Sequence, residues 1–155
     1  MSSATKVLFL DMDGVLVPFQ HPIGRENLFW STEAVECLNA IWVHTHAQIV
    51  ISSMWRFECT KEQMMSMLNE HGYVGTLHPD WRTPGNENVL SQRGAEILEW
   101  LDAHRGVAEW IVLEDSPVVI DHFPAEITDR LIRPVSEVGL TKDSLERALN
   151  ILSSG

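Results

Sequence analysis

The sequence predicts an α/β protein built on a doubly wound, mainly parallel sheet. Three short apolar runs, 7–10, 47–51 and 110–113, have the pattern of strands that are buried on both faces of such a sheet. Segments with the apolar spacing of amphipathic helices separate them, and this alternation is typical of parallel α/β folds. The 155 residues are enough for one core, so we expect a single domain over 1–155.

Composition excludes several classes of protein. The net charge of −11 opposes binding along a nucleic-acid backbone or to an anionic membrane. The two cysteines, Cys37 and Cys59, form no disulfide framework and indicate a reducing compartment. No apolar stretch has the length of a signal peptide or of a membrane span. We therefore expect a cytoplasmic protein that has no membrane partner.

The first strand, 7–10, runs directly into two carboxylates, Asp11 and Asp13, and then into Gly14. Carboxylates at the carboxyl end of a parallel strand lie where open α/β sheets bind their ligands. A solvated turn and a calcium loop are the other interpretations of this stretch. A calcium loop fits poorly, because Gly14 follows the second Asp at once and no later ligand positions come after it.

A short apolar piece, 15–19, follows and is a candidate arm of a hairpin, and a polar loop with Pro22 and Gly24 comes next. Ser31 or Thr32 is the expected cap of the first helix, whose opening turn is acidic. The apolar face of this helix has four members: Val35, Leu38, Ile41 and Trp42.

The second strand, 47–51, is followed by another helix. Thr60 is the expected cap of this helix, because Gln63 stands at the spacing of a capping box. The helix should end at Gly72. A short strand is then expected over 73–77, and a loop rich in Pro, Gly and Asn over 78–88.

Ser91 is the expected cap of a third helix over 92–105, which Gly106 should end. The third clear strand, 110–113, comes next, and a brief strand over 131–133 follows later. A C-terminal helix completes the fold, with Thr141 as its cap. Its apolar face includes Leu145, Leu149 and either Ile151 or Leu152.

Polar side chains follow each of the three clear strands, and the carboxyl ends of parallel strands meet at one edge of a sheet. These residues are Asp11 and Asp13, Ser52 and Ser53, and Glu114 and Asp115. Carboxylates this close together repel one another without a cation, which indicates a hard, oxygen-preferring metal such as Mg²⁺. A hydroxyl beside them can hold a phosphate oxygen, and a basic residue is then needed to balance the charge of the phosphate.

This set of residues resembles the haloacid dehalogenase-like (HAD) phosphohydrolases over nearly the whole chain. Their first motif, an apolar strand followed by Asp-x-Asp-Gly-(Val/Thr), matches 10–15. Their second motif, a strand that ends in Ser or Thr, matches 49–52, and their fourth, a strand that ends in an acidic pair, matches 112–115. The resemblance implies a Rossmann-like core with a minimal cap or none.

The third motif of these enzymes is usually a lysine, and here the sequence departs from the family. Arg93, in the first turn of the helix that leads to the acidic strand, is the favoured candidate for the phosphate clamp. Arginine can bind phosphate, although it is not equivalent to lysine. Lys61, nine residues after Ser52, is the alternative.

Two further stretches narrow the resemblance. Residues 52–56, Ser-Ser-Met-Trp-Arg, and residues 139–141, Gly-Leu-Thr, look like a small bacterial group whose members also occur as domains of RNA-repair proteins. The run 113–117 also looks like the Asp-Asn-Ser-Pro segment of phosphatases that act on phosphoserine tails. The form of the first motif fits those phosphatases less well.

The resemblance implies a role for each acidic residue. Asp11 would attack phosphorus and become an aspartyl phosphate. Asp13 would protonate the leaving oxygen and later deprotonate the attacking water. Mg²⁺ would be held by the Asp11 carboxylate, the Asp13 backbone carbonyl and Asp115. Glu114 would orient either a metal-bound water or the basic residue.

The resemblance also implies that Ser52, Ser53 and Arg93 bind the transferred phosphoryl group. Trp55 and Arg56 are candidate substrate contacts, with the ring stacking on a base while the guanidinium meets a phosphate. The favoured interpretation of Trp55 is nevertheless a loop aromatic that packs on its own domain.

The leading interpretation is a Mg²⁺-dependent phosphomonoester hydrolase with an open site. Its substrate is a nucleotide, a phosphoprotein or a phosphorylated nucleic-acid end, and the sequence leaves this choice and the oligomeric state open. The alternative is a non-catalytic phosphate- or partner-binding module that has kept the fold. Because Asp11 and Asp13 are both present, we favour the enzyme. The span 57–90 is long enough for a small lid.

Overall fold

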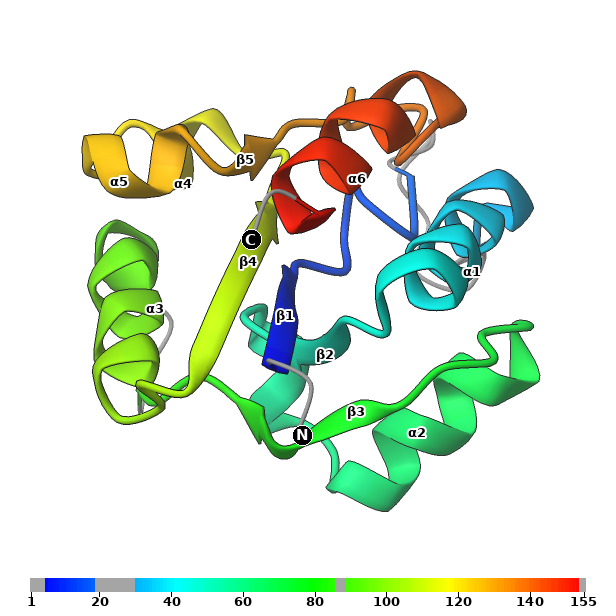
Figure 1. The fold of residues 1–155 in the computed structure, drawn as a ribbon, viewed down its shortest axis with the longest axis horizontal. Helices are drawn as coiled ribbons and strands as arrows, with labels where there is room; N and C mark the ends of the chain where they lie inside the picture. The colour runs from blue at the N-terminus through cyan, green and yellow to red at the C-terminus, as the bar shows by residue number, and fades with distance from the viewer. Residues whose placement is uncertain (1–4, 19–29, 86–88, 154–155) are drawn as a thin grey trace.

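Five parallel strands form one sheet in the computed structural model, which describes residues 5–18, 30–85 and 89–153 (Figure 1). The strands are β1 (Thr5–Leu10), β2 (Gln48–Ile51), β3 (Leu77–Arg82), β4 (Val107–Leu113) and β5 (Leu131–Ile132). Their order in the sheet is β3-β2-β1-β4-β5, so β1 is central. The predicted doubly wound, parallel α/β fold is confirmed.

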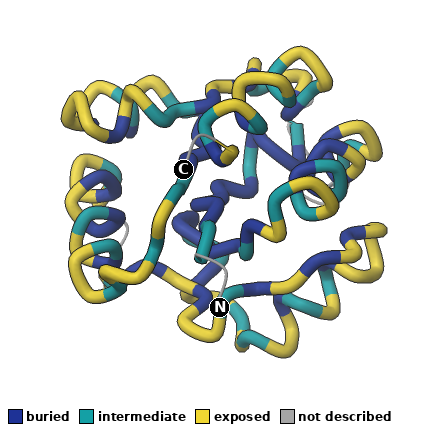
Figure 2. Tube along the Cα trace, in the orientation of Figure 1, coloured by how far each residue is buried: buried dark blue, intermediate teal, exposed yellow. Residues whose placement is uncertain are grey.

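Helices cover both faces of this sheet (Figure 1). One group is α1 (Thr32–Thr45), α2 (Lys61–Glu70) and α6 (Leu145–Ser153); the other is α3 (Arg93–Asp102), α4 (Pro117–Ile120) and α5 (Ala125–Thr128). Side chains alternate along β1, so that Leu8 and Leu10 enter the core under the first group. Val7 and Phe9 enter the core under the second. Figure 2 shows that the central strands β1 and β2 are mostly buried between the two layers, whereas β3 at the edge is largely exposed.

Phe9 fixes α3 against the centre of the sheet. Its ring meets Trp100 of α3 edge to face at 5.4 Å between centroids, and Trp110 of β4 at 6.0 Å. Aromatic pairs of this kind contribute roughly 0.5–1.5 kcal/mol beyond the area they bury. Because α3 begins at Arg93, this packing sets the position of that residue relative to the carboxyl end of β1.

The first two helices begin as their sequences predict. Ser31, rather than Thr32, caps α1, because its Oγ accepts a hydrogen bond from the backbone N–H of Ala34 at 3.1 Å. Thr60 and Gln63 form the complete capping box at the start of α2.

The predictions for the edge of the sheet are wrong. The sequence pattern predicts a strand over 73–77 and a loop over 78–88, but β3 is Leu77–Arg82. Pro79 makes this segment look like a loop, because proline has no backbone N–H to donate to a neighbouring strand. It is tolerated here because β3 lies at the edge of the sheet. The described part of the suggested lid, 57–85 and 89–90, therefore contains α2 and an edge strand of the sheet.

The later caps also differ from expectation. Ser91 lies within a 3₁₀ turn, η3 (Leu90–Gln92), and α3 starts after it and ends before Gly106. Thr141 makes no side-chain cap bond to the 3₁₀ turn η4 (Lys142–Ser144), which precedes α6. The sequence pattern does not predict α4 and α5, because four residues are too few to show a helical period.

Some predictions fall on residues outside the described ranges. The candidate hairpin arm 15–19 is described only to Pro18, and the loop with Pro22 and Gly24 is outside the description. Within the described part of this stretch, Asp13 and Val17 form an isolated bridge. Among the described helices, none has the length and apolar character required to cross a lipid bilayer.

Candidate active site

The residues directly after the strands continue the backbone hydrogen bonding of the sheet at its carboxyl edge. The backbone N–H of Asp11 donates to Leu113 of β4, and that of Ser52 donates to Leu10 of β1, both at 3.0 Å. The backbone N–H of Glu114 donates in the same way to Ile132 at 3.3 Å. Backbone register therefore holds these polar residues side by side, although they come from distant parts of the sequence.

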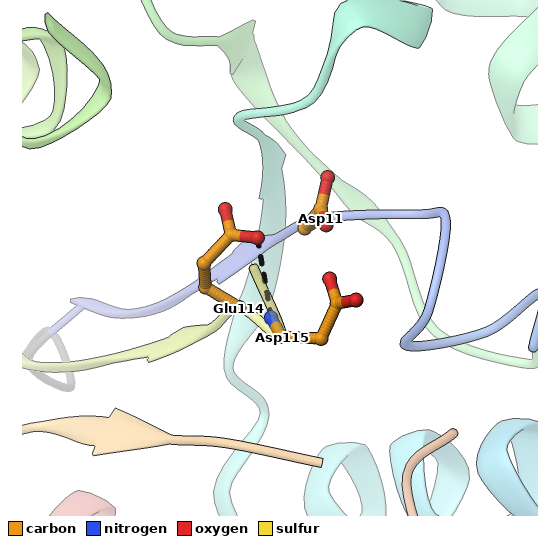
Figure 3. A group of neighbouring side chains, drawn as sticks. All are labelled: Asp11, Glu114 and Asp115. Carbon is orange, nitrogen blue, oxygen red and sulfur yellow. Dashed lines mark hydrogen bonds between the residues drawn. The ribbon is translucent and has the colours of Figure 1, made fainter. Parts of the chain in front are cut away.

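Three carboxylates meet at this edge, those of Asp11, Glu114 and Asp115 (Figure 3). One oxygen of each lies within 4.8 Å of the others, and the residues are only 7%, 2% and 4% exposed. Burial, and then the negative charge of Glu114, raise the pKa of Asp11 well above its usual value. Burial also raises the pKa of Glu114. A hard divalent cation that prefers oxygen ligands would offset this concentration of charge.

Two residues lie close to the Asp115 carboxylate. The Ser136 hydroxyl donates to its Oδ2 at 2.6 Å. Gly14 has a φ of 82°, and a Cβ atom built on it would collide with the Asp115 carboxylate, so only glycine fits at this turn. Sequence reasoning missed Ser136, because nothing in its local sequence marks a contact with a residue 21 positions earlier.

Arg93 is the cation that the structure brings to the carboxylates. Its Nη1 lies 3.7 Å from Asp11 Oδ1 and 3.8 Å from Glu114 Oε1. These separations are too long for hydrogen bonds, so the guanidinium balances the acidic charge without being bonded to either group. In the described part of the chain no ion pair links Lys61 to the cluster. The pKa of His78 is lowered by burial, then by His104, and to a smaller extent by the charge of Lys61.

Glu114 uses both of its oxygens. Oε2 accepts hydrogen bonds from the backbone N–H groups of Asp115 and Ser116, each at 3.2 Å (Figure 3 draws the first). Oε1 is the atom that faces Arg93. Of the two roles predicted for Glu114, this geometry suits the orientation of the basic residue.

Asp13 does not belong to the group of three carboxylates, and it is partly buried. Its Oδ2 accepts a hydrogen bond from the indole Nε1–H of Trp55 at 3.2 Å. This arrangement is compatible with a predicted metal contact through its backbone carbonyl alone. The single polar atom of the Trp55 side chain is thus bonded to another residue of the protein.

The two serines after β2 differ in what their hydroxyl groups do. Ser53 Oγ accepts a hydrogen bond from the backbone N–H of Trp55 at 3.2 Å and so caps the 3₁₀ turn η2 (Met54–Phe57). Within the described residues, the hydrogen bonds found for Ser52 are those of its backbone N–H and carbonyl, and none involves its hydroxyl, although Ser52 is only 2% exposed. Ser52 is thus the serine whose hydroxyl is available to a ligand.

The interpretation of Arg56 as a substrate contact does not fit the structure. The residue is 1% exposed, and each of its five N–H donors has a protein acceptor. The acceptors are the backbone carbonyls of Ser52, Ser53, Thr83 and Pro84 and the carboxylate of Glu96. Burial lowers the pKa of Arg56 to about 10, so it stays charged at neutral pH. Arg56 ties the end of β2, the segment after β3 and α3 together.

The comparison with known protein families agrees with this arrangement. The family described as the HAD domain in Swiss Army Knife RNA repair proteins matches residues 7–145, a range that includes every site residue named above. No curated protein and no solved structure was found to match the chain. Because the family match spans most of the sequence, the chain belongs to this family of HAD domains.

Proposed function

We propose that the chain is a Mg²⁺-dependent phosphomonoester hydrolase that works through an aspartyl phosphate on Asp11. The observation that carries the proposal is the meeting of Asp11 with two other buried carboxylates and with Arg93 at one edge of the sheet. Membership of a HAD family supports chemistry of the phosphohydrolase type.

The proposed reaction has two halves. In the first, an Asp11 carboxylate oxygen forms a bond to phosphorus while the bond from phosphorus to the leaving oxygen breaks, and Asp13 gives that oxygen a proton. In the second, Asp13 takes a proton from water as the water oxygen attacks phosphorus, and the Asp11 carboxylate and phosphate are released. Ser52 and Arg93 would bind the oxygens of the phosphoryl group throughout.

The buried acidic cluster fits a divalent cation, because its repulsion and its raised pKa values are what such an ion would relieve. The Asp11 and Asp115 carboxylates and the Asp13 backbone carbonyl would hold the ion. Bound there, Mg²⁺ would offset the charge between the carboxylate nucleophile and an anionic phosphate.

Mg²⁺ is expected to raise the melting temperature, and to raise it more at about pH 7.5 than at about pH 5. The folded-state pKa values of Asp11 and Glu114 lie above their usual values. Between the usual and the raised values the folded protein therefore binds more protons than the unfolded chain, so metal-free stability falls as pH rises. A cation that binds the ionised, folded cluster offsets this loss.

Thermal scans in MgCl₂ and in EDTA at both pH values check this expectation. Asp115→Asn should remove most of the Mg²⁺ effect, and Asp121→Asn, on an exposed residue at the end of α4, should keep it. If Mg²⁺ leaves the melting temperature unchanged at both pH values, the cluster is not a magnesium site.

A panel of phosphate esters tests the proposed activity. The family takes its description from RNA repair proteins, so RNA and DNA with 3′ or 5′ phosphate ends come first, beside nucleotides, sugar phosphates and phosphopeptides. The net charge of −11 favours recognition of an end over recognition of a long backbone. Release of inorganic phosphate that depends on Mg²⁺ is the expected result. If Mg²⁺ binds but no ester is hydrolysed, the chain is a non-catalytic module.

Arg93→Ala should reduce kcat/KM by an amount equivalent to roughly 2–4 kcal/mol of transition-state stabilisation, as does the loss of a single electrostatic donor in other enzymes. Lys61→Ala, on a half-buried residue at the start of α2, should change it little. Arg93→Lys should recover only part of the rate, because an ammonium group cannot reproduce the planar fork of donors. Steady-state kinetics on the best ester of the panel measures all three. The opposite ranking of Arg93 and Lys61 would assign the phosphate clamp to Lys61.

A further inference from the structure

The hydrogen bond between Trp55 and Asp13 joins the segments after β2 and β1, which are 42 residues apart in the sequence. We propose that Trp55 is a positioning residue, which holds the Asp13 carboxyl group in the orientation that proton transfer requires. The inference rests on the proposed function, because it assigns Trp55 a task in that reaction. Trp55 Nε1 is 3.2 Å from Asp13 Oδ2, and both side chains are partly buried.

Two neighbours fix the turn and the ring of Trp55. The Ser53 hydroxyl caps the turn that carries it and bonds to its backbone N–H. Trp30 meets the ring edge to face, with 6.1 Å between centroids and 75° between planes. Trp30 in turn stacks on His71, at the end of α2, at 4.0 Å and 8°. The position of the Trp55 indole is thus set by its own capped turn and by Trp30, which is itself stacked on His71.

The chemistry of the indole group decides which oxygen of Asp13 does the work. An indole N–H only donates, so Oδ2 must accept, and a proton carried by the carboxyl group is placed on Oδ1. In the first half of the reaction Oδ1–H gives this proton to the leaving oxygen. In the second half Oδ1 takes a proton from water. Trp55 stays bonded to Oδ2 in both halves, so the same oxygen acts as acid and then as base.

A pair of phosphate esters with different leaving groups distinguishes positioning from a general packing role. Trp55→Phe keeps an aromatic ring and removes the N–H. It should lower kcat/KM for an alkyl phosphate, which needs a proton on its leaving oxygen, by about tenfold or more. For p-nitrophenyl phosphate, whose leaving group departs as an anion, the change should stay within about threefold. Trp42→Phe, on α1 against His46, is the matched control and should change neither rate. Equal losses for the two esters would overturn the proposal.

Nuclear magnetic resonance tests the contact without any turnover. The six tryptophans each give one indole N–H signal, and Trp55→Phe identifies the signal that belongs to Trp55. Asp13→Ala should shift that signal toward the position of an unbonded indole and leave the Trp42 signal in place. If the signal shifts but no ester is hydrolysed by the wild type, the proposed function fails and Trp55 positions a residue of a binding site. If esters are hydrolysed but the signal does not move, the positioning role fails and the phosphatase stands.

Discussion

Asp11→Asn is expected to abolish turnover while the protein stays folded. Loss of a catalytic nucleophile lowers kcat by about 10³-fold or more, because an amide is a poor nucleophile and a weak metal ligand. The melting temperature of the metal-free protein, in contrast, should not fall. Asp11 is 7% exposed, and burial together with the charge of Glu114 makes its ionised form unfavourable. A neutral amide removes this cost, so the metal-free variant should melt no lower than the metal-free wild type.

Phosphate release from the best substrate and thermal scans in EDTA together measure this prediction. Asp121→Asn makes the same chemical change on an exposed residue and should keep the wild-type rate. A rate near that of the wild type in Asp11→Asn would remove Asp11 from the mechanism. A large fall in melting temperature would mean that the Asp11 carboxylate stabilises the fold, which its raised pKa argues against.

The sequence predicts the centre of the fold better than its edge, for a physical reason. Strands β1, β2 and β4 lie inside the sheet, with a strand on each side and helices over both faces. Their buried residues therefore form continuous apolar runs that are easily recognised in the sequence. Among the described strands β3 pairs with β2 alone, and it contains His78, Pro79 and Asp80, which have the composition of a loop. Its strand conformation comes from pairing with β2, and that pairing is a tertiary effect.

The sequence also predicts which residues lie in the site better than it predicts the hydrogen bonds and ion pairs that they make there. Because the carboxyl ends of parallel strands converge, the sequence pattern is enough to place Asp11, Glu114 and Asp115 together. Arg56 and Arg93 look alike in the sequence, but Arg56 is bonded to five protein acceptors while Arg93 faces the carboxylates. Only the three-dimensional packing of distant segments makes this distinction.

Arg56→Ala should lower the free energy of unfolding by roughly 3–5 kcal/mol, which is the typical cost of breaking a buried ion pair from one side. The change leaves Glu96, at 8% exposure, without the guanidinium that lies 3.0 Å from it. It also leaves four backbone carbonyls without their side-chain donor. Arg56→Lys supplies fewer donors and no planar fork, so its stability should lie between those of Arg56→Ala and the wild type.

Urea denaturation of these variants at two pH values identifies the source of the loss. Burial raises the pKa of Glu96, and the charge of Arg56 acts against this rise. Without Arg56 the folded-state pKa of Glu96 should rise further, so the destabilisation should be greater at neutral pH than at about pH 5, where Glu96 takes up a proton. Glu96→Gln in the Arg56→Ala background should then restore part of the stability at neutral pH.

Arg105→Ala is the control for the loss of an arginine ion pair at the surface. The Arg105 side chain is 84% exposed and pairs with Asp102 at 2.9 Å, an arrangement worth at most about 1 kcal/mol. The two arginines therefore make ion pairs of similar length, and they differ in burial and in the number of acceptors they satisfy. If Arg56→Ala costs no more than Arg105→Ala, the buried network does not hold β2, β3 and α3 together. Backbone hydrogen bonds of the sheet, such as that from Ser52 to Leu10, would then be what positions the end of β2.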